Sequence, residues 1–275
     1  MEFIEIMKAI ILGIIEGITE WLPVSSTGHM ILVDEFLQLN MSPAFKEMFF
    51  VVIQLGAIMA VVVLYWKKIF PFSFKKKPLV QKSIIIMWIK VIIACLPAAV
   101  IGLLFDDKVN ELFYNFQTVA IMLILFGIFF IVVENYNKGK IPVATDMDQL
   151  TFKMAIIIGL FQVIAAVFPG TSRSGATILG ALLIGVSREV ATEFTFFLAI
   201  PVMFGASLLK LVKFGFVFTG FEMLILSVGS IVAFIVSILA IKFLVGYIKK
   251  HDFKVFGWYR IILGIIVLLY FYVIR

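Results

Sequence analysis

Six long apolar runs account for much of the chain, and polar or charged stretches separate them. A helix needs about 20 apolar residues to cross the roughly 30 Å of hydrocarbon in a bilayer. The runs that approach or exceed this length are 48–66, 84–104, 117–134, 193–212, 223–247 and 258–274. We interpret each of them as a full transmembrane helix.

Two further apolar regions, 6–38 and 152–186, differ from these runs because Pro, Gly, Ser and Thr interrupt each of them in the middle. Non-helical backbone at membrane depth is tolerated only where protein or a water-filled cavity satisfies its polar groups. We therefore expect two broken, re-entrant helical hairpins in addition to the six spans.

The two interrupted regions align with each other when the sequence is shifted by 146 positions. Gly13 and Pro23 then fall on Gly159 and Pro169, and hydroxyl residues follow each proline. A shared pattern at one offset indicates an internal repeat.

Each half of the chain contains one interrupted region and three spans, so the repeat units are about 6–134 and 152–274. Because three is odd, a second re-entrant hairpin has to enter from the opposite face of the membrane. This arrangement is an inverted-topology repeat, which brings two half-helix tips together near the midplane. The expected fold is a single integral-membrane domain over 1–275.

The composition supports a membrane protein. Hydrophobic residues make up 63% and charged residues 15% of the chain, and the mean hydropathy is +1.15. Soluble domains contain roughly 45–50% apolar and about 25% charged residues. These values exclude a soluble globular domain and a disordered chain, and the single Cys95 excludes a disulfide scaffold. Long runs without alternation argue against a transmembrane barrel, so the fold class is an all-α polytopic membrane protein.

Lysines gather in alternate loops and predict the orientation. Loops 67–82, 135–153 and 248–257 are the basic ones and are placed in the cytoplasm by the positive-inside rule, which leaves 105–116 and 213–222 outside. The lysines of the first loop are Lys67, Lys68, Lys75, Lys76, Lys77 and Lys82. The net charge of +6 thus indicates topology rather than nucleic-acid binding. No removable signal peptide is expected, because the N-terminus lacks a basic region.

The first interruption carries the motif E-G-I-T-E-W-L-P-V-S-S-T-G-H at 16–29. Glu16 and Glu20 are four residues apart and share one helix face. Carboxylates inside a membrane segment are costly and usually face a cavity, a partner or an ion. Pro23 stops the incoming helix, and His29 opens the returning one. The hydroxyls of the turn between them belong to Ser25, Ser26 and Thr27.

The second interruption carries P-G-T-S-R-S-G at 169–175, in which three hydroxyl residues, Thr171, Ser172 and Ser174, surround Arg173. Two helix N-termini with hydroxyls and a guanidinium make a good anion site, and Arg matches the oxygens of phosphate. Nearby carboxylates suit a bridging divalent cation, either Mg²⁺ or Ca²⁺.

Taken together, these groups suit hydrolysis of a phosphate ester or anhydride. His29 adds a group that titrates near neutral pH or attacks phosphorus directly. Simpler structural interpretations exist for each feature alone. Glu16 and Glu20 can form a buried ion network with Arg173, the hydroxyls can serve as helix caps, and His29 can be a packing residue. Their convergence on both halves of one repeat favours a functional site.

The sequence resembles the bacterial undecaprenyl-diphosphate phosphatase family, also called bacitracin-resistance proteins. The motifs at 16–29 and 169–178 carry the resemblance, and shorter matches lie at 53–57, 96–102 and 259–264. The resemblance implies dephosphorylation of undecaprenyl diphosphate to the monophosphate, which is the lipid carrier of cell-wall precursors. It also implies a requirement for Mg²⁺ or Ca²⁺, bacitracin resistance and a location in the bacterial plasma membrane. The biology of this substrate favours a site that opens to the outer face.

By motif position, the resemblance implies catalytic roles for Glu16, Glu20, Ser26, His29 and Arg173, with metal binding by the two glutamates. We expect the remaining hydroxyls to bind substrate: Ser25, Thr27, Thr171, Ser172 and Ser174. Ser26 and His29 remain alternative nucleophiles.

Two rival functions are a transporter or flippase for a phosphate-bearing lipid, which shares the inverted-repeat architecture, and a lipid phosphatase of another family. The latter needs a second histidine, and the other histidine of the chain, His251, lies in a predicted cytoplasmic loop. The expected partners are the lipid substrate and membrane lipids, with no nucleic acid, and a homo-oligomer is left open. Arg260 is expected either to reach the lipid head group or to anchor the last span at the interface. Gln54 and Gln162 are expected either to pack between helices, which is the favoured interpretation, or to hydrogen-bond at the site.

Overall fold

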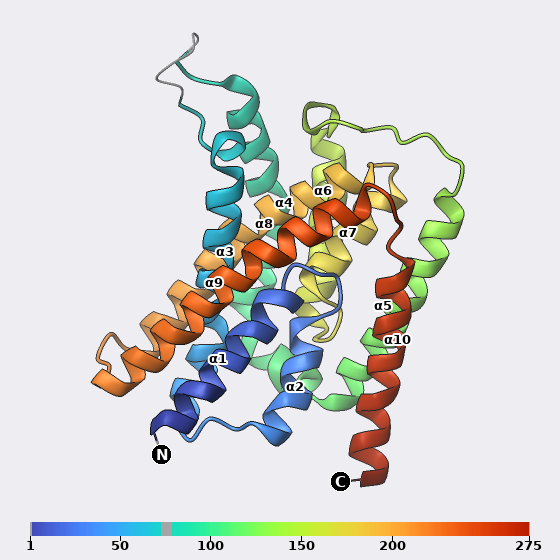
Figure 1. The fold of residues 1–275 in the computed structure, drawn as a ribbon. Coiled ribbons are helices and arrows are strands. Elements are labelled where there is room, and N and C mark those ends of the chain that lie inside the picture. Colours follow the sequence, from blue (N-terminus) through green and yellow to red (C-terminus); the bar gives the residue numbers. More distant parts are fainter. Residues whose placement is uncertain (1, 73–78, 275) are drawn as a thin grey trace.

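The computed structural model describes residues 2–72 and 79–274, and the described chain is helical, without a β-strand (Figure 1). The long helices are α3 (Pro43–Ile69), α4 (Lys82–Phe113), α5 (Phe116–Asn137), α8 (Arg188–Phe214), α9 (Gly220–Ile248) and α10 (Lys254–Leu269). The shorter ones are α1 (Glu2–Thr19), α2 (Ser26–Phe36), α6 (Phe152–Val167) and α7 (Arg173–Leu183). A 3₁₀ turn at Met147–Gln149 and a π-helical turn at Tyr270–Ile274 complete the elements.

The six predicted spans are confirmed as six long apolar helices. Helices α3, α5, α8 and α9 and the segments Lys82–Phe105 and Lys254–Val273 have the length and composition to cross a membrane. The predicted loop over 105–116 is wrong, because α4 continues to Phe113 and α5 already begins at Phe116. No Pro or Gly follows Phe105 in this stretch, so nothing local stops the helix.

The two interrupted regions form two pairs of short helices, α1–α2 and α6–α7. Helices α2 and α7 are both 11 residues long. In the first pair, the backbone N–H of Asn40 donates to Glu5 Oε2 at 2.8 Å. In the second pair, the N–H of Val143 donates to the carbonyl of Gly185 at 2.7 Å. The chain that leaves each pair therefore lies beside the chain that enters it.

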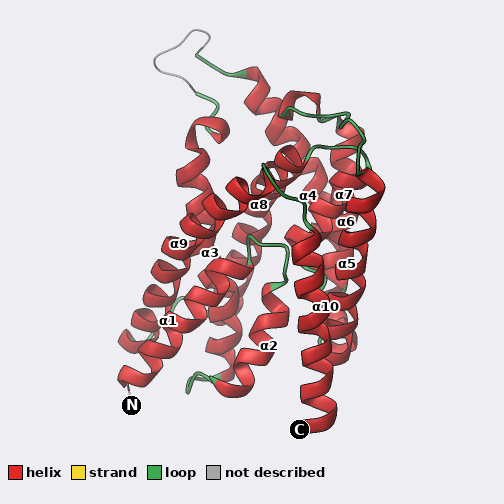
Figure 2. Cartoon of the chain, turned by 45° about the vertical axis from the view of Figure 1, so that its right-hand side comes forward, coloured by secondary structure: helices red, strands yellow, loops and turns green. Residues whose placement is uncertain are grey.

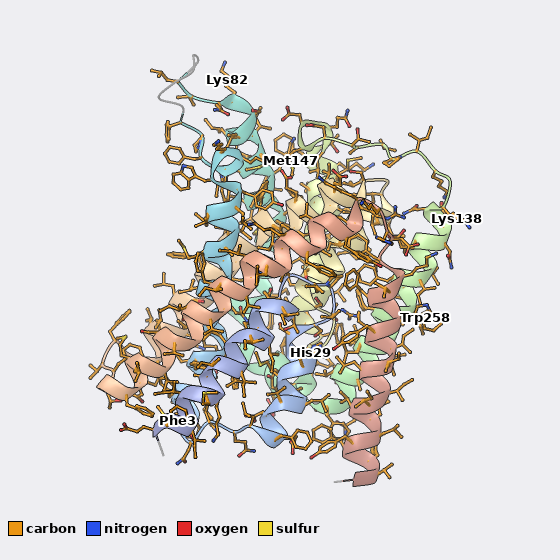
Figure 3. All side chains as sticks on the ribbon, viewed as in Figure 1. Phe3, His29, Lys82, Lys138, Met147 and Trp258 are labelled. Atoms are coloured by element: carbon orange, nitrogen blue, oxygen red, sulfur yellow. The ribbon has the colours of Figure 1, made fainter. Side chains whose placement is uncertain are left out.

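The two pairs begin at opposite ends of the helical bundle. Both chain termini lie at one end (Figures 1 and 2), whereas Lys82, Lys138 and Met147 lie at the other (Figure 3). Helix α1 starts at the terminal end, and α6 starts just after Met147. Of the lysines on which the predicted orientation rests, Lys75, Lys76 and Lys77 lie outside the described residues.

The first helix of each pair packs against a long helix of the other half of the chain. Helix α1 contacts α9, α6 contacts α4, and α3 contacts α8. Glycines permit these close contacts. A Cβ on Gly13 would lie 2.6 Å from the carbonyl oxygen of Gly229, and one on Gly159 would lie 2.3 Å from that of Ala94. The crossed packing brings the ends of α1 and α6 toward the middle of the molecule, where the two turns meet.

Candidate active site

The two turns have the same backbone geometry at one serine each. Ser25 and Ser172 have φ values of 72° and 71°, and they are the non-glycine residues with positive φ in the described chain. Each side chain caps the following helix, with Ser25 Oγ accepting from the N–H of Gly28 at 3.3 Å and Ser172 Oγ from that of Gly175 at 3.1 Å. Such conformations cost about 1–3 kcal/mol and cluster at functional sites. The strained caps point the N-termini of α2 and α7 at the region between the turns.

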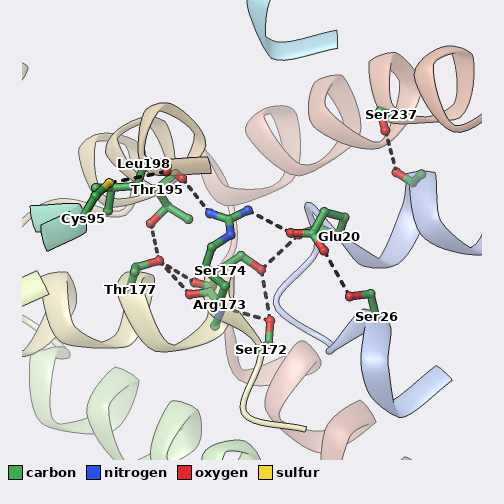
Figure 4. A network of polar contacts seen from close by, with 12 residues as sticks. Glu20, Ser26, Cys95, Ser172, Arg173, Ser174, Thr177, Thr195, Leu198 and Ser237 are labelled. Carbon is green, nitrogen blue, oxygen red and sulfur yellow. Dashed lines mark hydrogen bonds and ion pairs between the residues drawn. The ribbon is translucent and has the colours of Figure 1, made fainter. Parts of the chain in front are cut away.

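A salt bridge joins the two interrupted regions at this point (Figure 4). Arg173 Nη2 donates to Glu20 Oε1 at 2.9 Å, and Arg173 Nη1 donates to the carbonyl of Thr195 at 3.0 Å. Ser26 Oγ donates to the other carboxylate oxygen, Glu20 Oε2, at 3.0 Å. The two charged side chains are only 12% and 7% exposed. Four residues from α2, α7, α8 and the first turn thus share one connected polar network.

Further hydroxyls hold this network in place. Ser174 Oγ donates to the backbone carbonyl of Glu20 at 3.2 Å and lies 3.1 Å from Ser172 Oγ. Thr177 Oγ1 bonds to Thr195 Oγ1 at 2.9 Å, which supports the α8 segment that Arg173 contacts. The predicted substrate residue Ser174 is buried, and its hydroxyl connects the two turns.

A cavity of about 210 Å³ lies against this network. The predicted site residues on its wall are Glu20, Ser26, Thr27, Ser172 and Arg173. Its remaining lining residues are Gln54, Ala165, Pro169, Gly170, Val202, Met203 and Ala206. The structure therefore brings residues of both sequence motifs to one hollow, and Gln54 faces it instead of serving only helix packing.

Four predicted site residues are buried but do not line the cavity: Glu16, Ser25, Thr171 and Ser174. Glu16 Oε1 and Thr171 Oγ1 have no hydrogen-bond partner among the described residues, and neither amide atom of Gln162 has one. Unpaired buried polar groups cost about 1–3 kcal/mol each. An unpaired buried polar atom of this kind can be satisfied by a bound ion or ligand.

His29 lies on α2 (Figure 3), and other protein groups occupy both of its ring nitrogens. Nδ1 lies 2.8 Å from the carbonyl of Ser25, and Nε2 lies 2.7 Å from the hydroxyl of Tyr259. The two rings stack with centroids 5.6 Å apart. His29 is not among the cavity-lining residues, so the structure does not bring it together with Ser26 and Arg173 there.

Arg260 connects the two turns in a way that the sequence does not predict. Its guanidinium donates to the carbonyl oxygens of Pro23 at 3.2 Å, Gly170 at 2.9 Å and Thr171 at 2.8 Å, with a longer contact to Met122 at 3.4 Å. The residue is fully buried. Full burial excludes an anchor at the membrane interface, so that expectation for Arg260 is wrong. The expected contact with the lipid head group stays a prediction.

Comparison with known proteins places the chain in a family. The model of the family described as bacitracin resistance protein BacA matches residues 9–266, nearly the whole chain. The chain belongs to the BacA family. A protein of Desulfitobacterium hafniense named undecaprenyl-diphosphatase is 71% identical over 98% of both chains. Undecaprenyl-diphosphatase 1 of Clostridium acetobutylicum is 66% identical over 100% of both, and an Enterococcus faecalis undecaprenyl-diphosphatase is 62% identical over 98% of both.

The family match confirms the resemblance drawn from the motifs at 16–29 and 169–178, both of which lie within the matched residues. In this BacA-family chain, Tyr259 and Arg260 also belong to a short matching motif at 259–264. That motif was the available signal for both residues, although it did not indicate which groups they contact.

The carboxylates of this BacA-family site suit a hydrated divalent ion better than a closed protein cage. The described residues contain no group of three or more His, Cys, Asp or Glu side chains placed to hold a metal. Glu16 and Glu20 lie one helical turn apart, and Glu16 Oε1 is unpaired. Mg²⁺ is commonly bound by one or two carboxylates together with waters and substrate phosphates. The donor set therefore fits Mg²⁺, or Ca²⁺ with its similar preference for oxygen.

Proposed function

We propose that this chain hydrolyses undecaprenyl diphosphate to undecaprenyl phosphate and inorganic phosphate in the bacterial plasma membrane. The activity recycles the lipid carrier of cell-wall synthesis and thereby provides bacitracin resistance. The observation that supports it most directly is the Glu20–Arg173 pair, which joins two hydroxyl-lined helix N-termini at a cavity. Full-length relatives with 57–71% identity carry the name undecaprenyl-diphosphatase.

The second turn supplies positive charge for the diphosphate. Arg173 lines the cavity and can exchange part of its contact with Glu20 for phosphate oxygens. The N-termini of α2 and α7 add their dipoles and backbone N–H groups. Preorganised positive groups of this kind stabilise the charge that develops on the phosphoryl oxygens in the transition state.

Ser26 is our choice of nucleophile. Its hydroxyl lines the cavity and already donates to Glu20 Oε2, which is the arrangement of a nucleophile and its base. Ser26 Oγ attacks the terminal phosphorus and passes its proton to Glu20, and the bond from that phosphorus to the bridging oxygen breaks to release undecaprenyl phosphate. Water then attacks the phosphoserine phosphorus, the bond from phosphorus to Ser26 Oγ breaks, and Glu20 returns its proton to Ser26 Oγ as inorganic phosphate leaves. His29, held between Ser25 and Tyr259, supports the turn in this scheme.

Glu16 and Glu20 are the residues that would hold Mg²⁺ or Ca²⁺ together with the diphosphate. The bound ion would neutralise phosphate charge beside the carboxylates. The unpaired Glu16 Oε1 supports this assignment, because a buried carboxylate oxygen without a donor is suited to a cation.

The architecture that we propose is an inverted-topology repeat with α1–α2 and α6–α7 as re-entrant hairpins. Three observations support it: each pair returns to the end where it starts, the pairs start at opposite ends, and α1 and α6 pack on reciprocal partners. The site opens to the outer face, where the termini lie. Single cysteines at Lys138 and Val217 test this in spheroplasts. An impermeant thiol reagent should label Val217→Cys and not Lys138→Cys, with buried Cys95 giving little background.

One experiment tests the function against the transporter alternative. Purified protein in detergent receives undecaprenyl diphosphate with Mg²⁺ or Ca²⁺, and released phosphate is measured. We expect metal-dependent release by the unaltered protein and almost none by Glu20→Gln. Absence of release from folded protein that still moves the lipid across vesicles would contradict the enzyme and favour the flippase.

A further inference from the structure

A second cavity, of about 360 Å³, lies outside the site just described. Two helices, α4 and α8, form its wall near the end of the bundle that carries the chain termini. Its lining residues are Gly102, Leu103, Leu104, Phe105 and Lys108 from α4, and Leu209 and Lys213 from α8. We call this cavity the α4–α8 mouth.

One face of α8 borders both cavities. Val202 and Ala206 line the site cavity, whereas Leu209 and Lys213 line the α4–α8 mouth. Steps of four, three and four residues keep these side chains on the same side of a helix. Eleven residues of helix span about 16 Å at roughly 1.5 Å per residue, about half of the hydrocarbon thickness. The two cavities therefore follow one another from the middle of the bundle toward its end.

The chemistry of the mouth is mixed in a specific way. Lys108 and Lys213 are exposed and bring two positive charges, while leucine and phenylalanine side chains form the apolar wall. A Cβ placed on Gly102 would meet no atom within 4 Å, so the space beside it is open. Lysine ammonium groups bind phosphate as point charges, so the mouth combines phosphate-binding charge with an apolar wall.

We propose that the α4–α8 mouth is the first binding site of the incoming lipid diphosphate. The head group binds Lys213 and Lys108 there, with the first part of its apolar tail on the leucine wall. It then moves along the α8 face to the cavity of Ser26 and Arg173. This inference rests on the proposed function, and it assigns a substrate-recruiting role to two residues outside the catalytic motifs.

The charge is tested with Lys213→Gln, alone and combined with Lys108→Gln. Lys213 gives the sharper test because Lys108 follows two aspartates in the sequence. The matched control is Lys46→Gln, a lysine at the start of α3 that lines neither cavity. Charges at the rim of a site act mainly on association and its salt dependence. With undecaprenyl diphosphate at low ionic strength, we expect kcat/KM to fall about fivefold for Lys213→Gln, with kcat unchanged and the difference lost in high salt.

The open space of the α4–α8 mouth is tested by substitutions at two glycines. Gly102→Leu fills the mouth, whereas the matched Gly205→Leu adds the same side chain on α8 at a position that also has open space but lines neither cavity. We expect Gly102→Leu to raise KM severalfold and Gly205→Leu to leave it unchanged. Equal unfolding temperatures of the two glycine variants in detergent show that the fold is retained. The variants of the exposed lysines test the same proposed binding site without a change in packing.

Two results would contradict the proposed binding site. Unchanged kcat/KM in both Lys213→Gln and Gly102→Leu would overturn the proposal. A change confined to inhibition by added inorganic phosphate would also overturn it, because the mouth would then serve product exit rather than lipid entry. Failure of the proposed function itself looks different, since the unaltered protein would then release no phosphate at all.

Discussion

The first and second turns share a backbone and differ in chemistry. Each places a serine at positive φ as the cap of an 11-residue helix, Ser25 before α2 and Ser172 before α7. The next residue is a hydroxyl in the first turn, Ser26, and a guanidinium in the second, Arg173. The geometry that aims a helix N-terminus at the site is thus kept in both halves, while the reacting groups are divided between them.

The two turns differ in length by one residue, which alters how the two halves align. The prolines are 146 positions apart, whereas the capping serines Ser25 and Ser172 are 147 apart. The second turn therefore contains one additional residue after its proline. An alignment by the prolines pairs Ser26 with Ser172, but the structure pairs Ser26 with Arg173. The two residues that we assign to attack and to charge stabilisation thus occupy equivalent positions.

Of the two interrupted regions, the first, 6–38, contains acidic side chains and the second, 152–186, contains none. Glu16 and Glu20 fall on Gln162 and Ala166 in the second half. The site is therefore polarised, with carboxylates on one side and Arg173 on the other, and Glu20 is the point where the two sides touch. Such a division suits a diphosphate that needs both a cation-binding side and a direct cationic contact.

The largest expected effect comes from the first turn. Ser26→Ala removes the proposed nucleophile, and we expect phosphate release to fall by about a thousandfold or more. The matched control is Ser237→Ala, which removes a buried hydroxyl that donates to the carbonyl of Gly17 and does not line the cavity. An independent measurement is the covalent ³²P that the unaltered protein retains after reaction with ³²P-labelled undecaprenyl diphosphate. Ser26→Ala should retain none. Near-normal turnover by Ser26→Ala would contradict this assignment and favour His29 as the nucleophile.

The equivalent position in the second turn should come next. Arg173→Ala is expected to reduce kcat by about a hundredfold to a thousandfold, as for other groups that stabilise transition-state charge. Arg173→Lys should recover only part of this, because an ammonium lacks the fork that contacts both Glu20 and the Thr195 carbonyl. If Arg173→Ala released phosphate at a nearly normal rate, the second turn would not be the source of charge stabilisation in the transition state.

The one-sided placement of acids predicts a metal effect. Glu16→Gln should weaken the apparent affinity for Mg²⁺ by about 10–100-fold, whereas changing its counterpart, Gln162→Glu, should not strengthen activity. Titration of chelator-treated protein with Mg²⁺ measures this. The change of intrinsic tryptophan fluorescence, to which Trp21 next to Glu20 contributes, gives a readout independent of turnover. An unchanged metal titration for Glu16→Gln would leave Glu20 as the remaining acidic ligand.

Arg260 tests whether the two turns must be held together. Arg260→Met leaves the carbonyls of Pro23, Gly170 and Thr171 without their donor, which should lower unfolding stability by about 2 kcal/mol and activity by roughly tenfold. Arg260→Lys keeps the charge but cannot reach all three carbonyls, so it should restore kcat only partly. A stability loss without any change of kcat would limit Arg260 to a structural role.

The smallest expected effect concerns the caps themselves. At Ser25 and at Ser172, the alanine variant should be less stable to unfolding than the glycine variant by about 1 kcal/mol. Both variants lose the capping hydroxyl, but glycine adopts positive φ freely. This reverses the usual helix preference of alanine over glycine. Thermal unfolding of the four variants checks it, and equal shifts at both positions would strengthen the equivalence of the two turns.

The sequence predicted the spans and the breaks, and it selected the residues that meet at the cavity. The length of an apolar run is set by bilayer thickness, and Pro23 and Pro169 interrupt helices through local geometry. Spans and breaks can therefore both be recognised from the sequence alone. The pairing of Glu20 with Arg173 was among the interpretations considered, because few charges lie in apolar segments.

The remaining features depend on three-dimensional packing. Arg260 and Tyr259 lie on the last long helix, and nothing in their neighbours in sequence indicates that one faces two turns and the other faces His29. The continuation of α4 through a charged segment was missed because charge suggested a loop, although no residue there breaks a helix. The additional residue of the second turn was missed because only the backbone angles show where each cap lies.

The position of Arg260 has a consequence for how the protein is made. The residues that we assign to catalysis lie between 16 and 173, and they enter the membrane early during synthesis. The clamp that binds the carbonyls of both turns is supplied by α10, the last long helix. A nascent chain that lacks this helix holds both motifs but not the guanidinium that joins them. The contacts of Arg260 that join the two turns therefore form only once α10 has been synthesised and inserted.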